Sequence, residues 1–192
     1  ILCVLLLWLY STTFKKKLLT GNVIISALTA WVIIVVYFFA GAAIINYNGW
    51  HEGSYAFDVK KLYKFTILYA GFAFILSLIR EVVKDLEDMH GDAKYHCKTM
   101  PIEWGVPASK VFTAVWIIVC SASLTIIQIY VWQSGWWLSA VYCILFIILP
   151  LLFILKELKA AVIPADYHRI SSIIKLVMLT GILSMLFFKF YA

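Results

Sequence analysis

Five long apolar runs constrain what this chain can fold into more than any other feature. Each is close to the roughly 20 residues that an α-helix needs to cross the hydrocarbon core of a bilayer. The runs cover residues 23–45, 62–79, 111–132, 136–155 and 170–188. A sixth apolar run, residues 1–10, is too short to span and is interpreted as the end of a further helix.

The composition agrees with a chain that is surrounded by lipid. Apolar residues make up 64% of the 192 residues and charged residues only 14%, whereas about half of a soluble domain is apolar. We therefore predict an all-α, multi-span transmembrane helical bundle, with residues 1–192 forming a single membrane domain. Neither a Met nor a basic stretch precedes the first run, so we expect an N-terminally truncated chain rather than a signal peptide.

The basic residues indicate how the bundle is oriented. Cytoplasmic loops hold an excess of Lys and Arg, and twelve of the sixteen basic residues fall on one side of the predicted spans, at positions 15–17, 80–110 and 156–175. This side is predicted to be cytoplasmic, in a multi-pass protein of the cell membrane. The net charge of +6 favours membrane lipids or a phosphorylated substrate as partners, and not nucleic acid.

The longest hydrophilic stretch, residues 80–110, is interpreted as a cytoplasmic acidic loop, entered by a helix that continues the 62–79 run. Residues 80–92 alone hold five of the ten acidic residues of the chain. On a helix, four of them share one face because their spacings are four, three and four; we call this set the acidic stripe, and it consists of Glu81, Asp85, Asp88 and Asp92. Glu87 points elsewhere, and His90 with Gly91 is expected to end the helix.

Carboxylates one turn apart repel one another by a few tenths of a kcal/mol per pair, at about i,i+4 spacing. A cation would relieve this repulsion, and Mg²⁺ is commonly held by one or two carboxylates together with substrate phosphates. The stripe therefore predicts a Mg²⁺–diphosphate site beside basic residues. The alternative is a solvated helix end, in which Arg80 and Lys84 are ordinary partners of the acids.

Residues 80–92 contain the pattern Lys-Asp-x-Glu-Asp-x-x-Gly-Asp, and they are followed by Lys98-Thr99-Met100-Pro101-Ile102 and Gly105. This stretch closely resembles the second aspartate motif and downstream segment of the UbiA-type intramembrane prenyltransferases. Leu9-Tyr10-Ser11, Phe14-Lys15-Lys16 and Gly21-Asn22 resemble the loop two spans earlier in that family. The acidic pattern is most similar to that of geranylgeranylglycerol-phosphate geranylgeranyltransferases, which make ether lipids.

The resemblance implies the last six of about nine helices and a Mg²⁺-dependent transfer of a prenyl group from a prenyl diphosphate to a lipid-like acceptor. It implies Asp85, Asp88 and Asp92 as catalytic metal ligands. Lys84, Lys98, Tyr10 and Lys15 or Lys16 would contact the substrate; the stretched spacing after Tyr10 leaves the choice between these two lysines open. The family's first aspartate motif has no counterpart in the sequence, so we expect this chain to be inactive by itself.

Three other functions remain open at the level of sequence, and a fourth is disfavoured. An aromatic acceptor of the quinone pathways would suit the same site, because acceptor choice depends on pocket shape. A transporter normally places ionisable groups near the bilayer centre, and a structural subunit could retain half of a motif. A CDP-alcohol phosphotransferase would share Asp85 and Asp88, but Met89 replaces its glycine. The sequence does not indicate prenyl chain length or oligomeric state.

Overall fold

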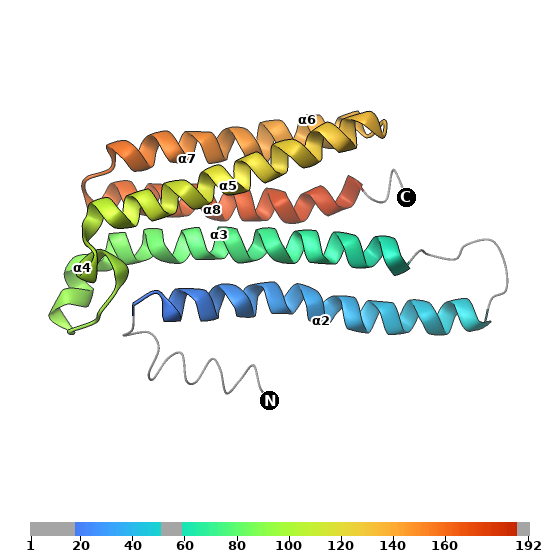
Figure 1. Cartoon of the computed structure of the whole chain (residues 1–192), viewed down its shortest axis with the longest axis horizontal. Coiled ribbons are helices and arrows are strands. Elements are labelled where there is room, and N and C mark those ends of the chain that lie inside the picture. Colours follow the sequence, from blue (N-terminus) through green and yellow to red (C-terminus); the bar gives the residue numbers. More distant parts are fainter. Residues whose placement is uncertain (1–17, 51–58, 188–192) are drawn as a thin grey trace.

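A computed structural model describes residues 18–50 and 59–187, and all the regular structure in these residues is helical. Five helices are long and apolar enough to cross a membrane (Figure 1). The elements are α2 (Thr20–Trp50), α3 (Val59–Lys94), α4 (Met100–Glu103), α5 (Gly105–Gln133), α6 (Trp137–Cys143), a π-helical segment η2 (Ile144–Ile148), α7 (Leu149–Ala160), α8 (Pro164–Leu183) and a 3-10 turn η3 (Ser184–Phe187).

The five predicted spans are confirmed, and each helical span extends beyond its apolar run at one end or at both. The run at 62–79 is the apolar part of α3, and the run at 136–155 is divided among α6, η2 and α7. The chain is an integral membrane protein with an all-α fold. The sixth apolar run, residues 1–10, lies outside the described residues.

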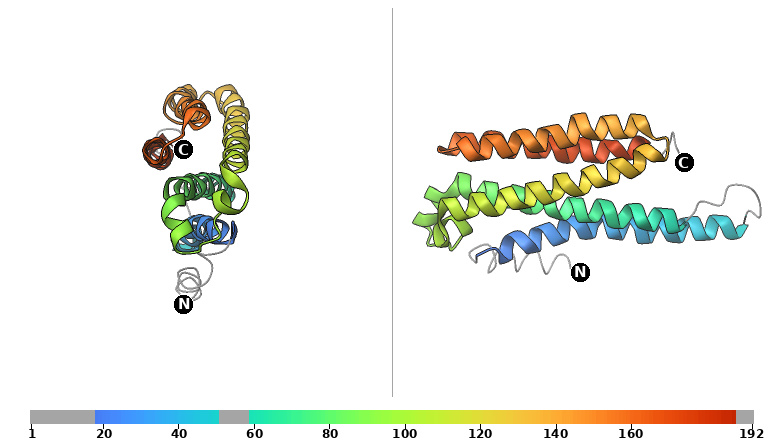
Figure 2. Two further views of the ribbon diagram at one scale, coloured as in Figure 1. Left: turned by 90° about the vertical axis from the view of Figure 1, so that its left-hand side faces the viewer. Right: turned by 45° about the horizontal axis from the view of Figure 1, so that its top comes forward.

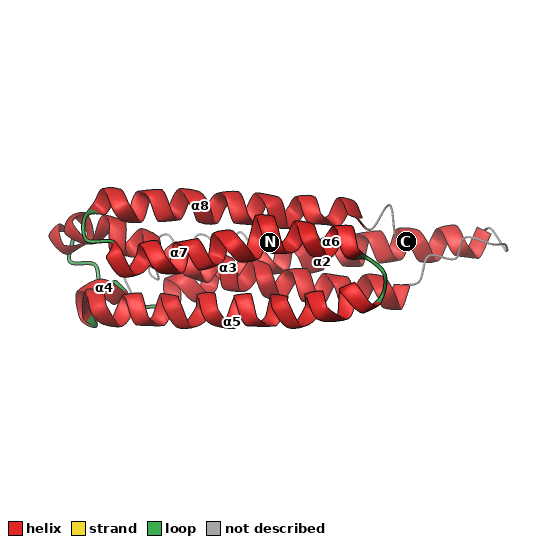
Figure 3. Ribbon diagram, turned by 90° about the horizontal axis from the view of Figure 1, so that it is seen from above, coloured by secondary structure: helices red, strands yellow, loops and turns green. Residues whose placement is uncertain are grey.

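Helix α3 lies between α2 and a group formed by the other spans. One of its sides contacts α2, and the other packs against α5 and α8, which in turn contact α7. The end-on view of Figure 2 shows α2 and α3 together, with the other three spans beyond α3. Seen from above, the long helices run along a common axis (Figure 3). We refer to the end of the bundle that carries α4 as the α4 end.

The apolar core is built by α3, α5, α7 and α8. Buried side chains recur every three or four positions along each of these helices, which is the spacing of one helix face. On α3 they are Leu76, Ile79, Val83 and Leu86, and the other helices contribute Ile117, Leu151, Ile154, Ile170 and Ile174. Because lipid tails are as apolar as these side chains, close packing rather than escape from water holds such helices together.

The segment 80–110 is largely helical, which corrects its interpretation as a loop, and Gly91 does not end the helix. Helix α3 continues to Lys94 because Val82, Val83 and Leu86 bury its inner face. Its end is a Schellman motif: the Cys97 N–H donates to Asp92 O and the His96 N–H to Ala93 O, with His96 at a positive φ of 52°. Gly91 is tolerated inside the helix at a cost of about 1 kcal/mol.

The α6–α7 span contains a break that the sequence analysis did not anticipate. At η2 the Leu149 N–H bonds to Ile144 O, five residues back. Pro150 has no amide N–H, so it cannot donate to Phe146 O as an α-helical residue would. The Thr180 hydroxyl of α8 lies 3.0 Å from that carbonyl and also 3.0 Å from Val177 O of its own helix, so its one proton is shared between the two acceptors. A side chain from the next helix thus supplies a donor inside the membrane, where unsatisfied backbone groups are costly.

Candidate functional site

The acidic stripe lies on the last turns of α3, at the α4 end. Asp85 and Asp92 are half-buried and Asp88 is exposed. The carboxylates of Asp92, Glu81 and Asp88 all repel that of Asp85, as expected for groups that share a face. Glu87 lies on another side of α3, as predicted, and its carboxylate is 2.8 Å from the His168 ring of α8.

Two members of the stripe have polar partners close at hand. The Arg80 guanidinium pairs with the Glu81 carboxylate at 2.6 Å, so the Glu81 charge is already balanced. The Asn22 side-chain amide of α2 donates to Asp85 Oδ2 at 2.7 Å. Asn22 is neutral, so it does not balance a charge on Asp85.

The described residues contain no group of three or more His, Cys, Asp or Glu side chains placed to hold one metal ion. A closed, all-protein metal cage is thus not formed by these residues. Mg²⁺ does not require one, because it keeps several waters and often shares its coordination between one or two carboxylates and substrate phosphates. The hard oxygen donors of one or two of Asp85, Asp88 and Asp92, rather than of all three on one ion, fit such a shared site.

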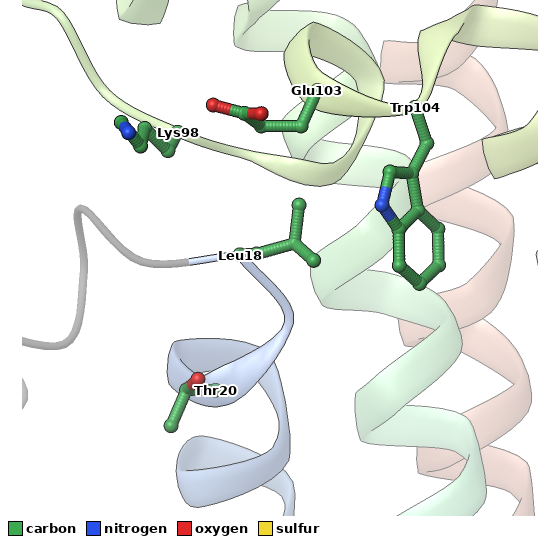
Figure 4. Close-up of a pocket in the computed structure, with 5 residues that line it drawn as sticks. All are labelled: Leu18, Thr20, Lys98, Glu103 and Trp104. Atoms are coloured by element: carbon green, nitrogen blue, oxygen red, sulfur yellow. The ribbon is translucent and has the colours of Figure 1, made fainter.

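The two described lysines that the sequence analysis selected lie on different elements. Lys84 is exposed on α3, within the acidic segment. Lys98 lies in the turn between α3 and α4 and lines a pocket of about 310 Å³ (Figure 4). Figure 4 shows Lys98 and Glu103 on one side of this pocket and the Trp104 indole on the other, with Leu18 and Thr20 of the α2 start below. Both lysines could attract an anion to the α4 end.

Three predicted substrate contacts, Tyr10, Lys15 and Lys16, lie outside the described residues. The structure adds one residue to the site, Asn22, and places another, His168, against Glu87 on a different side of α3. Asn22 was noticed only as part of a family resemblance, and His168 was counted in no motif. A signal for Asn22 does exist, since it is a polar residue at the border of an apolar run, but nothing in the sequence pairs it with Asp85.

Fold and site together define an integral membrane protein with several spans that presents an acidic helix face and lysines at one end. The model of the UbiA prenyltransferase family matches residues 1–173. The chain therefore belongs to the UbiA prenyltransferase family.

Several curated relatives carry the name digeranylgeranylglyceryl phosphate synthase. The protein of Methanosphaera stadtmanae is 26% identical over 187 residues, which cover 96% of this chain and 59% of the relative. That of Methanothermobacter thermautotrophicus is 30% identical, with coverage of 89% and 53%. That of Methanopyrus kandleri is 30% identical, with coverage of 94% and 58%. The chain thus spans a little over half the length of these relatives. No solved structure matches the chain significantly.

Proposed function

We propose that this chain is the part of a prenyltransferase that carries its second acidic motif. The enzyme would move an isoprenyl group from a prenyl diphosphate to geranylgeranylglyceryl phosphate at the membrane, a step of ether-lipid synthesis. The observation that carries the proposal is the acidic stripe on α3, beside lysines, in a chain of the UbiA family. The names of the relatives support the choice of acceptor.

In this proposal Asp85, Asp88 and Asp92 would supply the carboxylates that hold Mg²⁺ together with the substrate diphosphate, with one or two of them on any one ion. Bound Mg²⁺ would supply positive charge that favours departure of the diphosphate. Lys84 and Lys98 would bind and orient the same anion, together with Tyr10 and Lys15 or Lys16. These are electrostatic and positioning effects.

The transfer itself breaks two bonds and forms one, and the proton released by the acceptor passes to water. The C–O bond between the prenyl carbon and the diphosphate breaks, and its electron pair leaves with the diphosphate. The hydroxyl oxygen of the acceptor then forms the new C–O bond and loses its proton. The apolar prenyl tail would lie along the spans, where each buried CH₂ contributes about 0.8 kcal/mol.

We also propose that the α4 end faces the cytoplasm, because most Lys and Arg residues lie at this end of the spans and cytoplasmic loops hold an excess of them. The charged diphosphate group of the substrate would then reach the stripe from the cytoplasmic side. The family's first aspartate motif has no counterpart in this sequence, so we propose that residues 1–192 do not turn over substrate alone.

The test measures diphosphate release from geranylgeranyl diphosphate by the complete protein in detergent, with Mg²⁺ and geranylgeranylglyceryl phosphate. Asp88→Asn should lower turnover on the order of 100-fold, as loss of a group that stabilises developing charge does. Glu87→Gln is the matched control: it removes the same charge from the adjacent position, but Glu87 faces His168 of α8. Turnover of the control should stay within about twofold of wild type, the range of an exposed ion pair.

Each other outcome has a definite meaning. Release that requires an aromatic acceptor would retain the prenyltransferase and refute the ether-lipid step. Equal losses in the two variants would refute the role of the stripe. Wild-type protein that releases no diphosphate with any acceptor would refute the proposed function and favour a transporter or a structural subunit.

A further inference from the structure

Asn22 lies in the first turn of α2 and reaches across to α3. Its side-chain amide donates to Asp85 Oδ2 at 2.7 Å, between residues 63 positions apart in the chain. Only 9% of Asn22 is exposed, and the preceding Gly21 is buried. The contact is therefore a link between α2 and the acidic stripe that is buried on the Asn22 side and partly buried at Asp85.

The backbone around Asn22 is also fixed. The Ser26 hydroxyl, itself buried, donates to Asn22 O at 2.6 Å. Farther along the same pair of helices, the hydroxyls of Thr29 and Ser77 lie 3.4 Å apart. Small and polar side chains of this kind allow helices to approach closely in a membrane. Asn22 thus reaches Asp85 from a backbone position that is held by the Ser26 hydrogen bond and by the close approach of α2 to α3.

An amide suits this position for a chemical reason. A lysine or arginine would neutralise Asp85 and compete with a cation, as Arg80 balances Glu81 in the same stripe. The Asn22 amide donates a hydrogen bond without a net charge. It occupies one carboxylate oxygen, and a carboxylate has further lone pairs for another partner. Asp85 is therefore oriented by a partner that brings no competing positive charge.

We infer that Asn22 is a positioning residue, which holds the Asp85 carboxylate in the orientation that receives the cation of the diphosphate site. The inference rests on the proposed function and adds a second helix to that site. Asn22 itself would touch neither cation nor substrate. Partners that orient metal-binding carboxylates in this way typically change metal affinity or activity 10–100-fold, in order of magnitude, when they are replaced.

The test compares Asn22→Leu, which keeps the shape of the side chain and removes the donor, with Thr29→Val. The control removes a polar contact between the same two helices, farther from the stripe. Binding of Mn²⁺ to the complete protein in detergent is followed by electron paramagnetic resonance at a fixed concentration of inorganic diphosphate. The Mg²⁺ concentration for half-maximal turnover and the thermal midpoint are measured in parallel.

Asn22→Leu should raise the Mn²⁺ and Mg²⁺ midpoints about 10–100-fold, with turnover recovering at high Mg²⁺. Thr29→Val should leave both metal midpoints unchanged and lower only the thermal midpoint. An Asn22→Leu protein that melts earlier but binds Mn²⁺ normally would overturn the inference. If Asn22→Leu does not fold, Asn22→Ala is judged by the same criteria. Because Mn²⁺ binding is read without turnover, a wild type that binds Mn²⁺ but releases no diphosphate would refute only the proposed reaction.

Discussion

The two sides of α3 differ in chemistry as well as in neighbours. Towards α5 and α8, α3 presents Ile79, Val83 and Leu86, which are packed into the core. Towards α2 it presents Ser77 and Asp85, which meet hydroxyl and amide groups. The core side contributes packing, which is what stabilises helices in lipid. The α2 side orients individual polar side chains, because its hydrogen bonds fix the positions of groups such as the Asp85 carboxylate. On α3, the residues that stabilise the bundle and the residues of the candidate site therefore lie on different faces.

The largest expected effect is that of Asp85→Asn, on the α2 side. The amide is the same size and can still accept from Asn22, so the thermal midpoint should change by less than about 2 °C. Turnover should nevertheless fall on the order of 100-fold, because a charged metal donor is lost. Diphosphate release and thermal melting are measured on the same preparation. Substantial activity in this variant would contradict the assignment of the candidate site to the α2 side of α3.

The reverse behaviour is expected for Ile154→Ala, in the core. Ile154 is fully buried (0% exposed), so truncation leaves a cavity and should lower the free energy of unfolding by about 2 kcal/mol or more. The Mg²⁺ dependence of the folded protein should not change. Ile118→Ala makes the same truncation on α5, at a side chain that is 53% exposed, and should have an effect within about 0.5 kcal/mol. Equal destabilisation by both variants would contradict the assignment of the core.

The smallest effect is expected for the contact between the Glu87 carboxylate and the His168 ring, which joins α3 to α8 outside the core. The His168 side chain is 67% exposed, so solvent screens the pair and the coupling should be about 0–1 kcal/mol. A double-mutant cycle of Glu87→Gln and His168→Ala, followed by thermal melting, measures it. A coupling well above 1 kcal/mol would mean that the core alone does not hold α8 in place.

Local patterns predicted most of what is local in this structure. The apolar runs located the five spans, and the spacing of four, three and four placed the stripe on one face with Glu87 on another. The long-range pairing of Asn22 with Asp85 could not be predicted, since periodicity in one helix does not reveal which neighbour it meets. The end of α3 was misplaced because a glycine pattern does not reveal that buried residues extend the helix and that His96 takes the left-handed conformation.

Pro150 and Thr180 carry a consequence for how this sequence can change over generations. The proline removes a donor from Phe146 O, and the threonine on α8 supplies one. If the proline is replaced first, the backbone regains its own donor and the threonine becomes dispensable. If the threonine is replaced first, the carbonyl loses a donor within lipid, where such losses cost most. The order of the two substitutions therefore matters. In a lineage that loses both residues, Pro150 should be replaced before Thr180.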